Sequence, residues 1–126
     1  MAHHCKAAVL NCIDFRFQEA IDGFMKKQGL NGNADRIGIA GGVKNMGEMF
    51  QELSISERLH QVEDIYLINH QDCGAYGPEV AKDSKVELET HRSDMLMAKK
   101  IIQEKYPQIN VHAYFLTLDK DFVEIN

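Results

Sequence analysis

Three residues of the types that bind transition metals stand at two separated places in this chain of 126 residues. Cys12 follows one apolar run, while His70 and Cys73 follow another and are separated by two residues. Two thiolates and one imidazole form a borderline-soft donor set that favours tetrahedral zinc. Three protein ligands leave one coordination position open for water, as in catalytic zinc sites. The sequence therefore predicts a zinc site with an open position.

The elements that must position these residues are visible as alternating patterns. Apolar runs predict strands at 6–11, 36–40, 64–69 and 111–118, with a further candidate at 122–125. Apolar residues at helical spacing between those runs predict three helices. Their stripes are Phe17, Ile21, Phe24 and Met25; then Ile55, Leu59 and Val62; then Leu88, Met95, Ala98 and Ile102. This alternation predicts one α/β domain over residues 1–126, with a mainly parallel sheet and helices on both faces.

The predicted sheet explains how distant residues could share a site. Ligands of open α/β sheets bind beyond the carboxyl ends of the strands. If the strands at 6–11 and 64–69 are neighbours, Cys12 meets His70 and Cys73 across a short gap. The alternative is that Cys12 is a small core residue and that the His-x-x-Cys spacing arises by chance. The coincidence of both motifs at two strand ends favours the metal site.

Asp14 and Arg16 follow the first cysteine and are two residues apart, so both can point the same way. An arginine guanidinium can hold a carboxylate with two donors. One interpretation is a plain salt bridge between loops. The other is that Arg16 holds Asp14 off the metal, so that Asp14 accepts a hydrogen bond from zinc-bound hydroxide. If Arg16 released it, Asp14 could become the fourth ligand and close the site.

Three further features have weaker signals. Gly41 and Gly42 end the second predicted strand, either as a sharp turn or as backbone that lets N–H groups approach a small anion. Cys5 precedes the first strand and is expected to be an inert or surface thiol. His91 falls on an apolar helical stripe, which favours a core or interface histidine over a proton shuttle.

Composition excludes several classes of function. The net charge is −5 and the sequence pI is about 5.6, so nucleic acid is not an expected partner. No apolar stretch approaches membrane-spanning length, so no membrane association is expected. The three cysteines are an odd number in a chain long enough to need no disulfide scaffold. We therefore expect free thiols and a cytoplasmic protein.

At these positions the chain resembles the beta-class carbonic anhydrases. Members of that family carry Cys-x-Asp-x-Arg after the first strand, matched by Cys12, Asp14 and Arg16. They carry His-x-x-Cys-Gly after the third strand, matched by His70, Cys73 and Gly74. A segment of Arg-x-Ala-Gly type lies between, and 36–42 resembles it with some variation.

The resemblance implies a fold, an activity and a set of roles. It implies a three-layer α/β fold with a sheet in the order 2-1-3-4 and an antiparallel edge strand. It implies reversible hydration of carbon dioxide to bicarbonate, with one Zn²⁺ per chain on Cys12, His70 and Cys73. Asp14 and Arg16 would be the catalytic dyad, and a homodimer or a higher homo-oligomer the assembly. The glycines at 41 and 42 are our candidates for substrate binding.

Departures from the family pattern keep alternatives open. The chain begins at the first strand, without the N-terminal helices that embrace a partner in typical members. Phe15 and Phe17 flank the dyad where a small and an aliphatic residue are common. The short, polar loop at 74–85 predicts a more open pocket. The alternatives are a non-catalytic zinc-binding module on the same fold, or a hydrolase of a related small linear substrate such as carbonyl sulfide or carbon disulfide.

Overall fold

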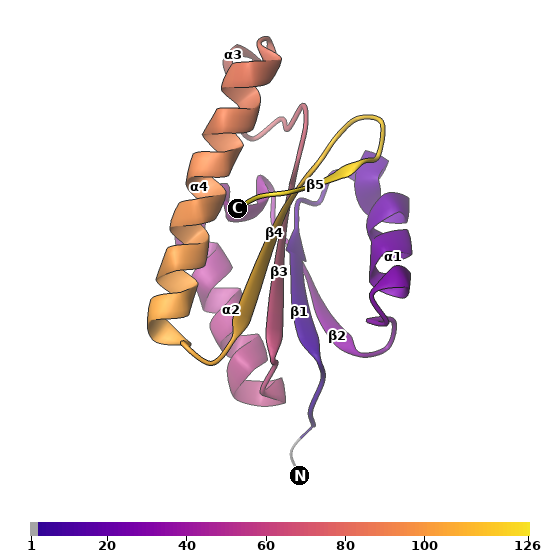
Figure 1. The fold of residues 1–126 in the computed structure, drawn as a ribbon, viewed down its shortest axis with the longest axis vertical. Helices are drawn as coiled ribbons and strands as arrows, with labels where there is room; N and C mark the ends of the chain where they lie inside the picture. The colour runs from indigo at the N-terminus through magenta and orange to yellow at the C-terminus, as the bar shows by residue number, and fades with distance from the viewer. Residues whose placement is uncertain (1–2) are drawn as a thin grey trace.

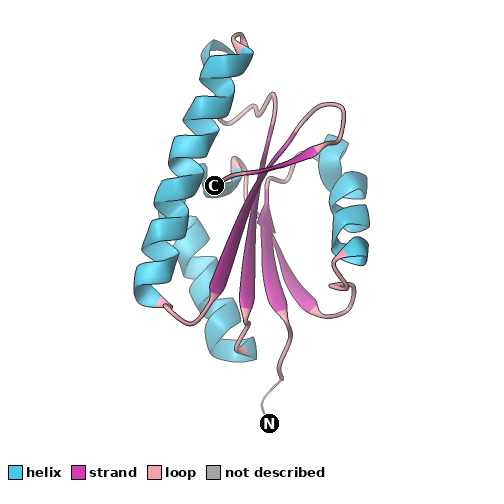
Figure 2. Ribbon diagram, in the orientation of Figure 1, coloured by secondary structure: helices cyan, strands magenta, loops and turns pink. Residues whose placement is uncertain are grey.

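A computed structural model describes residues 3–126 and contains one five-stranded sheet (Figures 1 and 2). The strands lie in the order β2-β1-β3-β4-β5. The first four are parallel, and β5 pairs antiparallel to β4 at the edge. The strands are β1 (Ala7–Asn11), β2 (Ala34–Gly38), β3 (Asp64–His70), β4 (Asn110–Leu116) and β5 (Phe122–Glu124). The predicted fold class and strand order are confirmed.

Helices cover both faces of the sheet, as Figure 1 shows. One face packs on α1 (Gln18–Lys27), and the other packs on α2 (Met46–His60) and α4 (Ser84–Lys105). Successive residues of a strand point to opposite faces, so Val9 of β1 packs with α1 while Leu10 packs with the other two helices. Every residue of β1 and β3 is buried, as expected for central parallel strands.

Three short helical turns complete the chain. Residues Phe15–Phe17 form the 3₁₀ turn η1 directly after β1, and Gly42–Lys44 form η2 after β2. The short helix α3 (Pro78–Ala81) lies inside the segment expected to be a polar loop, so the loop prediction at 74–85 is wrong in that part. Pro78 starts α3 because its fixed φ suits the first helical position.

The second predicted helix exists, but its buried stripe was misassigned. The buried face of α2 carries Met49, Leu53 and Ser56, whereas Leu59 is 51% exposed. Val62 is buried but lies beyond the helix, because Gln61 adopts a left-handed conformation that ends it. The apolar residues near the end of α2 therefore face away from the sheet.

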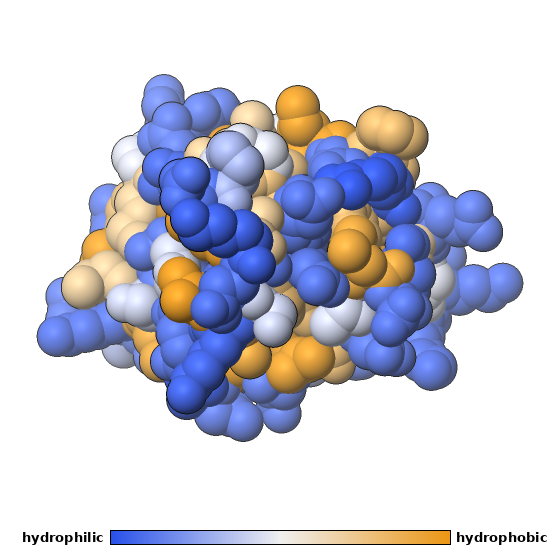
Figure 3. Space-filling model, turned by 90° about the horizontal axis from the view of Figure 1, so that it is seen from above, coloured by the Kyte–Doolittle hydropathy of each residue, from blue (hydrophilic) through white to orange (hydrophobic). Residues whose placement is uncertain are grey.

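The carboxyl ends of the parallel strands point toward the top of Figure 1. Figure 3 views the molecule from that end and shows apolar patches within a mostly hydrophilic surface. Two side chains just after β1, Ile13 and Phe15, are 62% and 85% exposed. Within residues 3–126, no helix has both the length and the apolar character needed to cross a bilayer.

Candidate metal centre

The structure brings Cys12, His70 and Cys73 together at the carboxyl ends of β1 and β3. These strands are neighbours, with Asn11 in register with Ile68. One donor atom from each of the three residues lies within 4.8 Å of the others, and all three residues are buried. The two sulfur atoms are 4.0 Å apart. The predicted juxtaposition of the three residues is confirmed.

The His70 ring is oriented for metal binding. Its Nδ1 lies 2.7 Å from the carbonyl oxygen of Gln71, which can only accept, so Nδ1 carries the proton and donates. Nε2 is then a lone pair, and it is buried with no hydrogen-bond partner among residues 3–126. Phe17 stacks on the ring with a centroid separation of 4.3 Å. An unpaired, fixed nitrogen beside two sulfurs fits a zinc ligand set.

The two thiols have different electrostatic surroundings. The Cys73 thiol hydrogen-bonds to Cys12, and together with the Gly41 N–H at 3.3 Å it holds the pKa of Cys12 well below the usual thiol range. The same hydrogen bond and burial raise the pKa of Cys73. The pair thus shares one proton without a cation. A bound divalent cation would displace this shared proton, because coordinating thiols are deprotonated outright.

Arg16 clamps the Asp14 carboxylate beside this group. Its Nη2 lies 2.7 Å from Asp14 Oδ2, and its Nε lies 3.1 Å from Oδ1. These hydrogen bonds lower the pKa of Asp14 to about 2. Asp14 Oδ2 is 3.8 Å from His70 Nε2, so the carboxylate stands next to the donor group while facing the guanidinium. The paired orientation predicted for Asp14 and Arg16 is present.

Asp72 holds Arg16 from its other side and is itself held by Glu87, and no sequence pattern had indicated either role. Arg16 Nη1 donates to Asp72 Oδ2 at 3.1 Å, and Nη2 donates to the Asp72 carbonyl oxygen at 2.9 Å. The Asp72 N–H in turn donates to Glu87 Oε2 at 2.7 Å. Glu87 is only 2% exposed, and burial raises its pKa. The available sequence signal was the spacing of Glu87, which stands four residues before His91 and eight before Met95. This spacing places the Glu87 carboxylate on the buried face of the helix.

Gly41 and Gly42 are used structurally at this site. The Gly41 N–H points at the Cys12 sulfur. A Cβ on Gly42 would overlap Asn69 Oδ1, which accepts from the Val43 N–H at 3.1 Å. The left-handed φ of +60° at Gly42 also requires glycine. Their expected role in substrate binding stays a prediction.

A buried polar network lies behind the ligands. Asn69 Nδ2 donates to Tyr76 Oη at 3.1 Å and approaches His91 Nδ1 at 2.9 Å. The Tyr76 hydroxyl donates to Asp94 at 2.9 Å. His91 is fully buried, and burial lowers its pKa to about 4, so it is neutral near pH 7. The expected core position of His91 is confirmed.

The sequence of this chain has counterparts among known proteins. A family model described as "Putative carbonic anhydrase" matches residues 2–126. The chain belongs to this carbonic anhydrase family. It is 29% identical over 124 residues to an uncharacterized protein of Rickettsia bellii (strain RML369-C). The match covers 88% of this chain and 76% of the Rickettsia bellii protein. An uncharacterized protein of Rickettsia conorii is also 29% identical, with 88% and 67% covered.

Solved carbonic anhydrases share the fold of this family member. The enzyme from Streptococcus mutans superposes with a TM-score of 0.68 at 17% identity, covering 99% of this chain and 84% of that one. The carbonic anhydrase from Glaciozyma antarctica superposes with a TM-score of 0.69 at 17% identity, covering 100% of this chain and 85% of that enzyme. The beta-carbonic anhydrase CafA of Aspergillus fumigatus superposes with a TM-score of 0.69 at 12% identity, covering 98% of this chain and 76% of that enzyme. The resemblance to the beta class is thereby confirmed at the level of family and fold.

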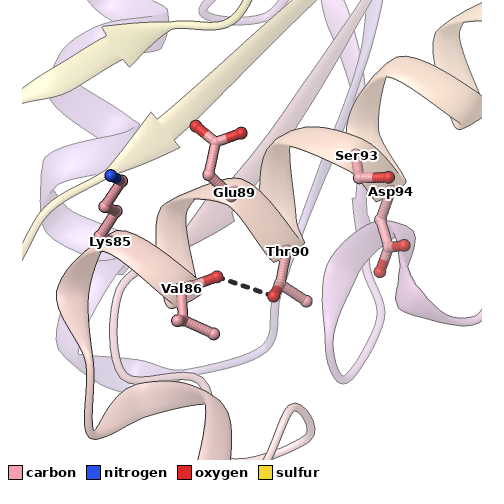
Figure 4. Close-up of a pocket in the computed structure, with 6 residues that line it drawn as sticks. All are labelled: Lys85, Val86, Glu89, Thr90, Ser93 and Asp94. Atoms are coloured by element: carbon pink, nitrogen blue, oxygen red, sulfur yellow. Dashed lines mark hydrogen bonds between the residues drawn. The ribbon is translucent and has the colours of Figure 1, made fainter.

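A separate groove of this carbonic anhydrase family member lies along α4 (Figure 4). It is lined by one stretch of that helix, from Lys85 to Asp94, where Thr90 Oγ1 donates to the Val86 carbonyl oxygen at 2.7 Å. None of the three candidate ligands lines it. The groove is therefore separate from the candidate metal centre.

Proposed function

We propose that this chain is a zinc enzyme that reversibly hydrates carbon dioxide to bicarbonate. The observation that carries the proposal is the buried, unpartnered Nε2 of His70, which faces two cysteine sulfurs next to a clamped carboxylate. Cys12, His70 and Cys73 would hold one zinc ion per chain. Zinc bound there would supply a hydroxide nucleophile from water near neutral pH.

The roles of the dyad follow from its contacts. With a pKa of about 2, Asp14 is a carboxylate at every pH at which the protein works, so it only accepts hydrogen bonds. Placed beside His70 Nε2, it can accept a hydrogen bond from the attacking water and orient the oxygen lone pair toward carbon dioxide. Arg16 holds both carboxylate oxygens and thereby keeps Asp14 from acting as a ligand itself.

The dyad also separates this proposal from a non-catalytic zinc module. A purely structural site is normally closed by four protein ligands. Here the nearest additional carboxylate, Asp14, is held by Arg16. No observation favours carbonyl sulfide or carbon disulfide as the substrate over carbon dioxide, so carbon dioxide is the substrate we propose.

Assembly and location are part of the same proposal. The exposed side chains of Ile13 and Phe15 flank the dyad, and their exposure supports a homodimer that covers them. The three cysteines are free in the structure, which supports a reducing, cytoplasmic environment.

The test combines metal analysis with stopped-flow carbon dioxide hydration. Wild type, Asp14→Ala and the matched control Asp119→Ala, an exposed aspartate in the β4–β5 turn, are purified under reducing conditions without chelator. We expect at least one zinc ion per chain in all three, and hydration that only Asp14→Ala loses. Wild type that carries zinc but is no faster than buffer at alkaline pH would establish the binding module instead. Absence of zinc from wild type would reject the site itself.

A further inference from the structure

We propose a second zinc site formed by Cys5, Asp35 and His60, at the end of the sheet opposite the first. One donor atom from each of these residues lies within 4.8 Å of the others. Ligand atoms of tetrahedral zinc are about 3.3–3.8 Å apart, given bond lengths near 2.0–2.3 Å. Side-chain movements of about 1 Å would therefore bring the three donors onto one ion.

Three different elements supply these donors. Cys5 precedes β1, Asp35 lies in the edge strand β2, and His60 is the last residue of α2. The Cys5 N–H donates to the His60 carbonyl oxygen at 3.2 Å, so the backbone already fixes the two residues side by side. Asp35 is in register with Ala8 near the start of β1. The cluster thus lies at the amino end of the sheet, toward the bottom of Figure 1.

The donor set is chemically suited to zinc. Sulfur, imidazole nitrogen and carboxylate oxygen are its usual ligands in proteins. One thiolate and one carboxylate would neutralise the ion. This position also accounts for Cys5 better than an inert surface thiol does.

Supporting contacts are already in place around the cluster. Asp35 Oδ2 lies 2.6 Å from His60 Nδ1, closer than two ligand atoms of one zinc ion, so metal binding would replace this contact. Asp35 Oδ2 also accepts a hydrogen bond from Ser56 Oγ at 2.7 Å. Outer partners of this kind orient metal ligands. The side chains of Asp35 and His60 are each 29% exposed, so an ion can enter from solvent. The His3 ring, whose centroid is 6.4 Å from that of His60, is within reach as a fourth ligand.

A metal here would have a structural role. It would tie the segment before β1 to the edge strand β2 and to the end of α2. Because the three ligands come from segments far apart in the chain, the site forms only when the chain is folded. Metal binding would therefore stabilise the folded state. This role does not depend on carbon dioxide hydration or on the ligands at the carboxyl ends of the strands.

Zinc stoichiometry of the full chain tests the proposal. Wild type, Cys5→Ser, Cys73→Ser and the double variant are purified under reducing conditions without chelator, and zinc is measured by mass spectrometry. Circular dichroism checks that each is folded. We expect two ions per chain in wild type, one in each single variant and none in the double variant. His60→Gln gives an independent variant should Cys5→Ser fail to fold, and should also retain one ion.

A cobalt spectrum identifies the ligand directly. In a Cys12→Ser/Cys73→Ser background, added Co²⁺ should give a thiolate charge-transfer band in the near ultraviolet, and Cys5→Ser should abolish it. Unchanged zinc content in Cys5→Ser and in His60→Gln would overturn the second site. Failure of the first site gives a different pattern, because Cys73→Ser would then leave the zinc content unchanged while Cys5→Ser lowers it.

Discussion

Replacing Arg16 by lysine tests whether the clamp on Asp14 keeps the metal centre open. Arg16 donates to both Asp14 carboxylate oxygens and also to Asp72. Lysine keeps the charge but has a single nitrogen and no planar fork, so it cannot reproduce both attachments. Asp14, whose Oδ2 is 3.8 Å from His70 Nε2, would then be free to move toward the donor group.

The size of the effect follows from the hydrogen bonds lost. A hydrogen bond to a charged group contributes about 1.5–3 kcal/mol, and about 1.4 kcal/mol corresponds to a factor of ten in population. Loss of one such bond would shift Asp14 toward the ligand position by a factor of about 10–100. We therefore expect hydration activity to fall about 10–100-fold while zinc content stays stoichiometric.

Stopped-flow hydration and metal analysis on five proteins provide the assay. They are wild type, Arg16→Lys, Asp14→Ala and the double variant, with Arg58→Lys on α2 as an exposed control. Because the double variant lacks the competing carboxylate, it should be no slower than Asp14→Ala alone. Wild-type activity in Arg16→Lys, or independent multiplicative losses in the double variant, would refute this account of the clamp.

Three other predictions use different measurements. Hydration activity should rise toward alkaline pH, since two thiolates cancel the formal charge of zinc and weaken its acidification of water; a flat rate between about pH 6.5 and 9 would contradict this. Gly42→Ala should lower the free energy of unfolding in urea by at least about 1 kcal/mol more than Gly29→Ala. Both glycines have left-handed φ, but a Cβ meets Asn69 only at Gly42 and open space at Gly29. Wild type should lose about 1 kcal/mol of stability between pH 7.5 and 5.5 through His91, and His91→Gln should not show this part of the loss.

The sign of the His91 effect comes from burial. Its pKa is lowered from 6.5 to about 4 in the fold, so the unfolded chain binds a proton that the folded chain does not. Stability from this histidine is therefore complete above pH 6.5 and falls as the pH drops toward 4. The comparison of wild type with His91→Gln at each pH removes contributions from other groups. Equal pH dependence in the two proteins would contradict the assignment.

Residues with strong local signals were predicted well. The short apolar runs within β1 and β3 are fully buried, a pattern typical of central parallel strands. Prediction failed where tertiary contacts choose between equivalent faces. The apolar residues Ile55 and Leu59 satisfy helical spacing, but the sheet packs on the face of α2 that carries Met49 and Leu53.

The candidate sites show the same division. Motif spacing was sufficient to predict Cys12, His70 and Cys73 as a group, because parallel neighbouring strands bring their carboxyl ends together. Asp72 and Glu87 were missed because each holds another residue rather than the metal. Asp72 accepts from Arg16 through its side chain and its carbonyl oxygen, and Glu87 accepts from the Asp72 N–H. Cys5 was expected to be inert because nothing in the sequence shows that Asp35 and His60 lie beside it.

The sequence by itself therefore determined the α/β class and the identity of the residues with metal-binding chemistry, since both depend on residue type and on short spacings. Only the tertiary structure decided the orientation of the His70 ring, the clamp on Asp14 and the meeting of Cys5 with His60. These depend on contacts between residues far apart in the chain. Their distances and angles arise from packing, which residue types and spacing do not specify.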